Sequence, residues 1–113
     1  MACGSLEIEI LNSVWDLTNS ENKSDISIQD VVDYLSEKGL ERAYTTIKTV
    51  MDRLVAKSVL VRYKSGKKFF YNATVDKDEM AANAVNEIIE NFFNGSSTDL
   101  IRFVENKYQL LSK

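Results

Sequence analysis

The sequence predicts a mostly α-helical protein with a small β-hairpin, arranged as a winged helix-turn-helix domain followed by a helical arm. Apolar residues recur at steps of three and four in five segments of the 113-residue chain, which is the period of amphipathic helices. Between the third and fourth of these segments, a β-rich run is interrupted by Ser65-Gly66, a pair typical of a hairpin turn. Charge also changes sign along the chain, because a basic stretch lies inside an otherwise acidic sequence.

The first two predicted helices follow from apolar spacing and from capping residues. Between positions 6 and 17, four apolar residues lie three or four positions apart, so one side of a helix is apolar. These residues are Leu6, Ile10, Val14 and Leu17. Ser27, with Asp30 three positions later, has the pattern of a helix N-cap and begins the second helix. Gly39 is expected to end it.

The third helix is predicted at about positions 43–57, and the strands of the hairpin at 59–64 and 67–72. At about 100° per residue, one side of the helix is apolar and is expected to face the core. That side holds Ile47, Val50, Met51 and Leu54, with Ala43 and Tyr44 nearby.

Two further helices are predicted after the hairpin. The fourth helix begins with Asp76, Asp78 and Glu79, because the helix dipole stabilises acidic side chains at a helix N-terminus. The fifth helix begins near Thr98, after a polar break. Both are apolar on more than one side, so we expect another surface to cover them. A second copy of the chain is the economical partner, and folding back onto the first helix is the alternative. The residues expected at a homodimer interface are Val85, Ile88, Ile89, Phe92, Phe93, Leu100, Ile101, Val104 and Tyr108.

Composition excludes several function classes. The chain has one cysteine and no histidine, so the usual zinc ligand sets are missing, and we expect no metal and no cofactor. Without histidine, a phosphate-binding glycine loop or a nucleophile elbow, an enzyme is not expected, although carboxylate chemistry stays open. No apolar run long enough for a membrane span and no signal peptide is present, so we expect a cytoplasmic protein.

The basic stretch extends from Glu41 to Asn72. It carries eight basic and two acidic residues, a net charge of +6, whereas the remaining residues sum to −9 and the whole chain to −3. Attraction to a polyanion depends on where charge lies and not only on its sum, so this stretch favours nucleic-acid binding. A solvated charged face without a ligand is the alternative.

The side of the third helix opposite the core carries short hydroxyls and long cations, which suit a DNA major groove. These candidate reading residues are Thr45, Thr46, Lys48, Thr49 and Arg53. Asp52 lies one turn beyond Lys48 and is expected to pair with it. Simple solvent exposure is the alternative for any one threonine. Five further basic residues on and around the hairpin are expected to contact phosphates: Arg42, Arg62, Lys64, Lys67 and Lys68.

Four segments together resemble the penicillinase repressor family. They are LEIEILNSVWDL, DVVDYL, AYTTIKTVMDRLVAKSVLVRYKSGKKFFYNATV and NEIIENFFNGSSTDLIRFVE. The resemblance implies a winged-helix DNA-binding domain at 6–73, a helical dimerisation domain at 74–113, and repression by a homodimer on a palindromic operator in double-stranded DNA. The alternative function is a winged helix used for protein–protein interaction, without an operator.

The resemblance also bears on induction. Relatives linked to β-lactamase regulation leave DNA when a protease cuts the last helix before a phenylalanine, and the matching bond here is Arg102-Phe103. An arginine stands where that pattern has asparagine. Copper-responsive relatives carry paired cysteines near the C-terminus, and this chain has none there.

Overall fold

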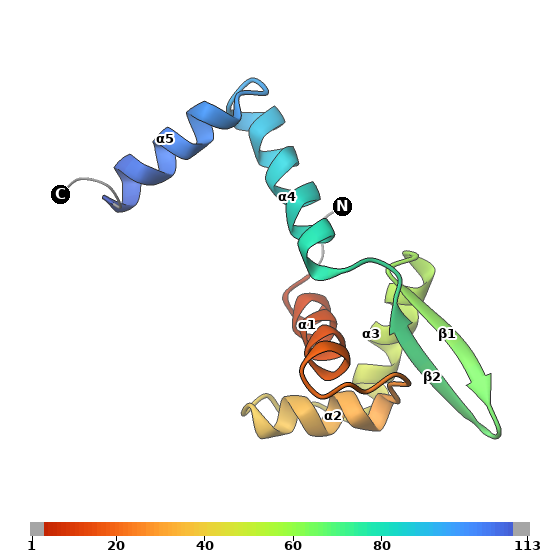
Figure 1. Cartoon of the computed structure of the whole chain (residues 1–113). Coiled ribbons are helices and arrows are strands. Elements are labelled where there is room, and N and C mark those ends of the chain that lie inside the picture. Colours follow the sequence, from red (N-terminus) through yellow and green to blue (C-terminus); the bar gives the residue numbers. More distant parts are fainter. Residues whose placement is uncertain (1–3, 110–113) are drawn as a thin grey trace. The chain divides into compact units, whose positions relative to one another are not determined.

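The computed structural model describes residues 4–109 and divides the chain into two compact units, one up to Lys77 and one from Asp78 (Figure 1). The elements in order are α1 (Ser5–Asn19), α2 (Ile28–Glu37), α3 (Tyr44–Ala56), β1 (Leu60–Ser65), β2 (Lys68–Ala73), α4 (Lys77–Phe92) and α5 (Ser97–Tyr108). The predicted five helices and hairpin are therefore present. Among the described helices, none is both long and apolar enough to cross a membrane.

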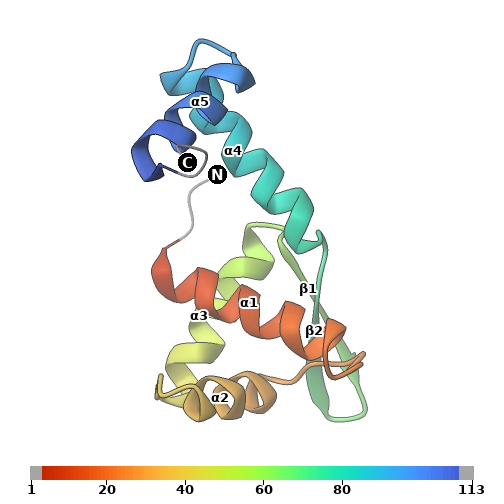
Figure 2. The same ribbon diagram turned by 60° about the vertical axis from the view of Figure 1, so that its left-hand side comes forward.

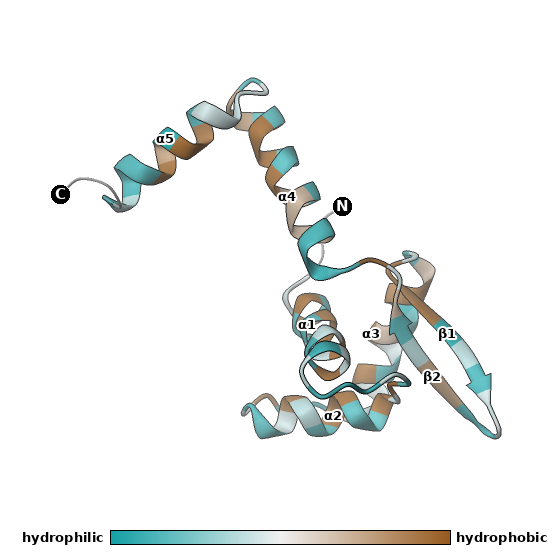
Figure 3. Cartoon of the chain, in the orientation of Figure 1, coloured by the Kyte–Doolittle hydropathy of each residue, from teal (hydrophilic) through white to brown (hydrophobic). Residues whose placement is uncertain are grey.

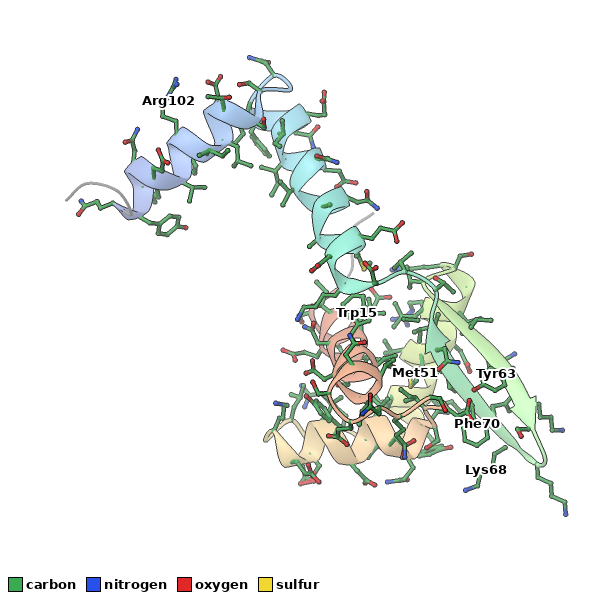
Figure 4. The ribbon with its side chains drawn as sticks, in the orientation of Figure 1. Trp15, Met51, Tyr63, Lys68, Phe70 and Arg102 are labelled. Carbon is green, nitrogen blue, oxygen red and sulfur yellow. The ribbon has the colours of Figure 1, made fainter. Side chains whose placement is uncertain are left out.

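The first unit is three helices around one apolar core, with the hairpin extending beyond them (Figure 1). Ile10 and Val14 of α1 are fully buried, because the predicted spacing brings them to one side of the helix. Trp15 lies beside them at 7% exposure, and its indole Nε1 donates a hydrogen bond to the carbonyl oxygen of Val75, 3.0 Å away (Figure 4). The chain after the hairpin is thereby fixed to α1.

Capping residues fix the bounds of α2 as predicted. The Asp30 amide donates to Ser27 Oγ at 3.1 Å, and the Ser27 amide donates to the Asp30 carboxylate at 2.9 Å. This reciprocal pair satisfies two amides that a helix start leaves without partners. At the other end, Gly39 has φ of +85°, a left-handed conformation that glycine adopts without steric cost.

The hairpin is an antiparallel ladder in which Leu60 pairs with Ala73 and Ser65 with Lys68. Its turn is therefore Gly66-Lys67, one residue later than predicted, with Gly66 at φ of +66°. Glycine with positive φ at the first turn position suits a two-residue hairpin, whereas serine there would be strained. A bridge between Ile26 and Tyr71 adds backbone hydrogen bonds to the other edge of β2 and ties the hairpin to the helices.

The second unit is a pair of helices joined by a short break (Figure 2). Ser96 caps α5 by accepting a hydrogen bond from the Asp99 amide at 3.1 Å. Phe93, just after α4, and Phe103 of α5 bring their ring centroids to 5.5 Å, which joins the two helices. Hydropathy colouring shows apolar bands running along both α4 and α5 (Figure 3).

Candidate nucleic-acid interface

The α3 helix has one buried and one exposed side. Ile47, Met51 and Leu54 are fully buried, as the apolar spacing predicts, and Val50 is 6% exposed. The candidate reading residues all lie on the exposed side of the helix: Thr45, Thr46, Lys48, Thr49 and Arg53. The Thr49 hydroxyl donates to the Thr45 carbonyl oxygen at 2.9 Å, so its side chain lies along the helix.

The expectation that Ala43 and Tyr44 face the core is wrong. Ala43 is exposed and Tyr44 is 47% exposed. Ala43 is the N-cap and Tyr44 the first helical residue, so both precede Ile47, where burial of α3 begins. Tyr44 therefore adds an exposed aromatic ring and a hydroxyl to the same end of the helix as the threonines.

The wing, defined as β1, β2 and their turn, carries exposed Lys64, Lys67 and Lys68. Figure 4 shows Lys68 extending away from the ribbon near the turn. Phe69 is 46% exposed, with the Arg62 guanidinium 4.9 Å and the Lys64 ammonium 5.7 Å from its ring centroid. The ladder register places these three residues on one face of the hairpin, because Lys64 pairs with Phe69 and side chains alternate along each strand. That face combines positive charge with an aromatic surface.

Asp52 links α3 to the wing through hydrogen bonds. Its carboxylate accepts hydrogen bonds from Lys48 Nζ at 2.9 Å, from Arg62 Nη1 at 3.0 Å and from the Tyr71 hydroxyl at 3.0 Å. The predicted Lys48 pair is thus present, and the partners from β1 and β2 are additional. Sequence reasoning missed them, because no local pattern connects a position on a helix with positions on strands that follow it.

This network shifts two pKa values. Burial, the largest single effect, raises the pKa of Asp52, but the hydrogen bonds from Lys48 and Tyr71 and the charges of Lys48 and Arg62 together lower it. Burial and the hydrogen bond to Asp52 raise the pKa of Tyr71 to about 12. At neutral pH the carboxylate is therefore charged and the phenol is protonated, so the phenol donates.

Besides Lys48, two basic residues of the stretch form ion pairs with carboxylates. Arg62 was expected to contact phosphate, and its guanidinium is ion-paired with Asp52 in the free protein. Lys57 is bound to Glu7 of α1 at 2.9 Å, and the Glu7 side chain is only 7% exposed. The hydrogen bond from Lys57, followed by that from the Gly4 amide, lowers the pKa of Glu7. Lys57 therefore joins α1 to the end of α3, away from the exposed side of the helix.

Some of the apolar residues predicted for dimerisation are exposed, and others are half-buried or buried. Exposed ones form a stripe with helical spacing: Val85, Ile88 and Phe92 on α4, at 41%, 44% and 76%, and Ile101 and Tyr108 on α5, at 57% and 65%. Phe93, Leu100 and Val104 are half-buried, and Ile89 is buried at 9%. Ile89 is thus buried, and the residues of the stripe are exposed to solvent.

The Arg102-Phe103 bond lies within α5. The Arg102 side chain is 67% exposed and points away from the ribbon (Figure 4), with an ion pair of 3.9 Å to Asp99 one turn earlier. Within residues 4–109, no group of three or more histidine, cysteine or acidic side chains could hold a metal ion.

Helices α1 to α3 with the following hairpin define a winged-helix protein, of the kind found among transcriptional regulators. A solved structure of the ferric uptake regulator from Francisella tularensis with iron shares this fold, with a TM-score of 0.52, 16% identity, and coverage of 81% of this chain and 80% of that one.

The particular family follows from the sequence. The profile of the family described as penicillinase repressor matches residues 3–113, so the chain belongs to that family, and the resemblance is confirmed. The penicillinase repressor of Staphylococcus aureus is 26% identical over 103 residues, covering 89% of this chain and 81% of the relative. An uncharacterised 16.5 kDa protein in the ptsI 3′ region of Latilactobacillus sakei is 34% identical over 84 residues, covering 74% of this chain and 53% of that protein.

Proposed function

We propose that this chain is a cytoplasmic transcriptional repressor that binds a palindromic operator in double-stranded DNA as a homodimer. The observation that carries the proposal is that an acidic chain holds eight of its fourteen basic residues between Glu41 and Asn72, and seven of these eight are exposed around α3 and on the wing that follows it. Membership of the penicillinase repressor family supports repression as the outcome of binding.

In the proposed complex, α3 enters the major groove. Threonine hydroxyls can bond a base edge or a phosphate, and Lys48 can reach a guanine acceptor. The exposed threonines occupy the first half of α3, which is the part of a recognition helix that contacts base edges in this class of fold. Thr45, Thr46 and Thr49 are therefore the proposed reading residues together with Lys48.

The wing would hold the flanking backbone. Lys64, Lys67 and Lys68 are exposed ammonium groups around a tight turn, and contacts of this type position a protein on DNA without reading sequence. Arg42 precedes α3 and Arg53 lies on its exposed side, so both can reach phosphates beside the groove.

The exposed stripe of the second unit supports the homodimer. Its five large apolar residues are exposed on both helices, and exposed apolar surface of this size commonly marks a protein–protein interaction site. A two-fold interface buries the same stripe in both copies. The two copies of α3 would then meet successive major grooves, which requires an operator with two inverted half-sites.

Binding to duplexes recovered from a randomised DNA pool tests the proposal. The purified chain is titrated against a recovered duplex and against a duplex of unrelated sequence, at two salt concentrations. Saturable binding at two protomers per duplex, retained in excess unrelated DNA, is the expected result. Failure to enrich any duplex would contradict the operator and favour the alternative, a winged helix whose basic face meets an acidic protein partner.

We further propose that cleavage at Arg102-Phe103 releases the repressor in a β-lactamase-type induction pathway. Proteases bind extended backbone, so α5 must open locally before the bond is reached. Because Phe103 contacts Phe93, a cut there would separate α5 from α4. Incubation with the induced cognate sensor protease should yield a shortened chain, and a Phe103→Ala variant should resist it. A chain that stays intact after this incubation would remove cleavage from the proposal.

A further inference from the structure

We propose that Asp52 is a positioning residue that restrains two DNA-facing cations and so limits non-specific DNA binding. The inference rests on the proposed DNA-binding function. Asp52 itself is not a DNA contact in this proposal, because it acts through Lys48 on α3 and Arg62 on β1.

The Asp52 carboxylate is hydrogen-bonded to both cations at once. One oxygen of Asp52 accepts from Lys48 Nζ at 2.9 Å, and the other accepts from Arg62 Nη1 at 3.0 Å. The Tyr71 hydroxyl donates to that second oxygen at 3.0 Å from the buried end of β2. Tyr71 thus fixes the carboxylate from the core side, while the cations occupy its outer side.

Partial burial makes these pairs stronger than ordinary surface ion pairs. The Asp52 side chain is 29% exposed, whereas those of Lys48 and Arg62 are 50% and 40% exposed. The carboxylate is therefore shielded more than its partners, and three donors replace the water it has lost. Lys48 and Arg62 each retain further N–H groups for a ligand, since an ammonium has three donors and a guanidinium five.

Two consequences follow for DNA binding. Non-specific attraction depends on cations that replace condensed counterions, and cations already paired with a carboxylate contribute less to it. A base acceptor that meets the free N–H groups of a fixed Lys48 keeps its full hydrogen bond. The carboxylate therefore weakens binding to unrelated DNA more than binding to the operator.

The test compares Asp52→Asn with the wild-type chain on two duplexes, one recovered from a randomised pool and one of unrelated sequence. We expect the variant to bind unrelated DNA about five- to tenfold more tightly at low salt, with a log–log salt slope steeper by about one. Binding to the recovered duplex should rise by less than about twofold, so the ratio of the two affinities falls.

One matched control separates restraint from net charge. Glu41→Gln makes the same change of net charge just before α3 and should keep the affinity ratio within about twofold of the wild type. If Glu41→Gln shifts the ratio as far as Asp52→Asn does, charge alone explains the effect and the inference is overturned. Equal weakening on both duplexes by Asp52→Asn would show a structural role and also overturn it.

A second experiment tests the restraint with Asp52 unchanged. In the wild-type background, Lys48→Gln should reduce the salt slope on unrelated DNA by less than half the reduction caused by Lys67→Gln, because Lys48 is already paired and Lys67 lies exposed in the turn. Equal reductions would overturn the restraint. A wild-type chain that binds neither duplex would contradict the proposed function itself, which is a different outcome from normal binding with an unchanged ratio.

Discussion

Replacing Phe92 with alanine should dissociate the proposed dimer. Phe92 is the most exposed of the large apolar residues, at 76%. With about 200 Å² for a phenylalanine, about 150 Å² of it remains in solvent in one protomer. At about 25 cal/mol per Å², covering that area contributes about 4 kcal/mol per copy and about 8 kcal/mol per dimer. If an alanine variant loses half of this, the dimer weakens about a thousandfold.

Sedimentation equilibrium over a range of protein concentrations measures this change. The wild-type chain should be dimeric at micromolar concentration, and Phe92→Ala should be monomeric there. Ile8→Ala is the matched control, because Ile8 is an exposed apolar residue on α1, at 47%, outside the stripe. Circular dichroism confirms that each variant keeps its helices.

Either of two results would refute the reasoning. A wild-type chain that stays monomeric at high concentration would show that the stripe is not a self-association surface. A Phe92→Ala dimer within about threefold of wild-type affinity would show that dimerisation uses another surface, since truncation of a central aromatic residue commonly costs about 2 kcal/mol or more.

Three further predictions concern the first unit. Replacing both Lys67 and Lys68 with alanine should reduce the salt slope of DNA binding by about 1.8, measured by fluorescence anisotropy, and an unchanged slope would exclude the wing as a phosphate contact. Lys57→Met should destabilise the unit by about 2–3 kcal/mol, because it leaves the buried Glu7 carboxylate without its cation. Urea unfolding followed by Trp15 fluorescence measures this, and adding Glu7→Gln should restore most of the loss; no restoration would refute the pairing. Since the folded-state pKa of Glu7 lies below 4.5, its contribution is present above that pH and disappears as pH falls through the lower folded value. As pH falls through this range, the free energy of unfolding of the wild type should decrease more steeply than that of Glu7→Gln. Parallel decreases in the two proteins would argue against a lowered pKa of Glu7.

The sequence predicted features that depend on nearby residues. Helix spacing identified the buried side of α3, and Ser27 with Asp30 identified the start of α2, because each pattern is complete within a few positions. The turn of the hairpin was misplaced by one residue, since Ser65-Gly66 and Gly66-Lys67 both contain the glycine and the ladder decides between them. Tyr44 was misassigned because periodicity continues to the end of a helix even where the core does not.

Contacts between distant positions could not be predicted in the same way. Glu7 and Lys57 lie fifty positions apart, and Asp52 reaches Tyr71 across nineteen. Charge and hydroxyl groups at such separations have many conceivable partners in a sequence, and only packing of the helices and strands selects one. The set of phosphate-binding cations therefore stays a prediction, and the sequence did not distinguish the exposed lysines of the wing from Arg62, which is paired with Asp52.

On the proposed function, the second unit raises DNA affinity through dimerisation, without any contact to DNA. A single protomer of net charge −3 has one basic helix side and one wing, and two of its cations are held by Asp52. Such a surface binds DNA weakly by itself, whereas linking two copies makes the second contact intramolecular and raises affinity by about a hundredfold or more. Separation of the exposed stripes would remove that gain at both half-sites at once. On the proposed function, a cut inside α5 therefore releases DNA by ending dimerisation, while α3 and the wing keep their folded structure.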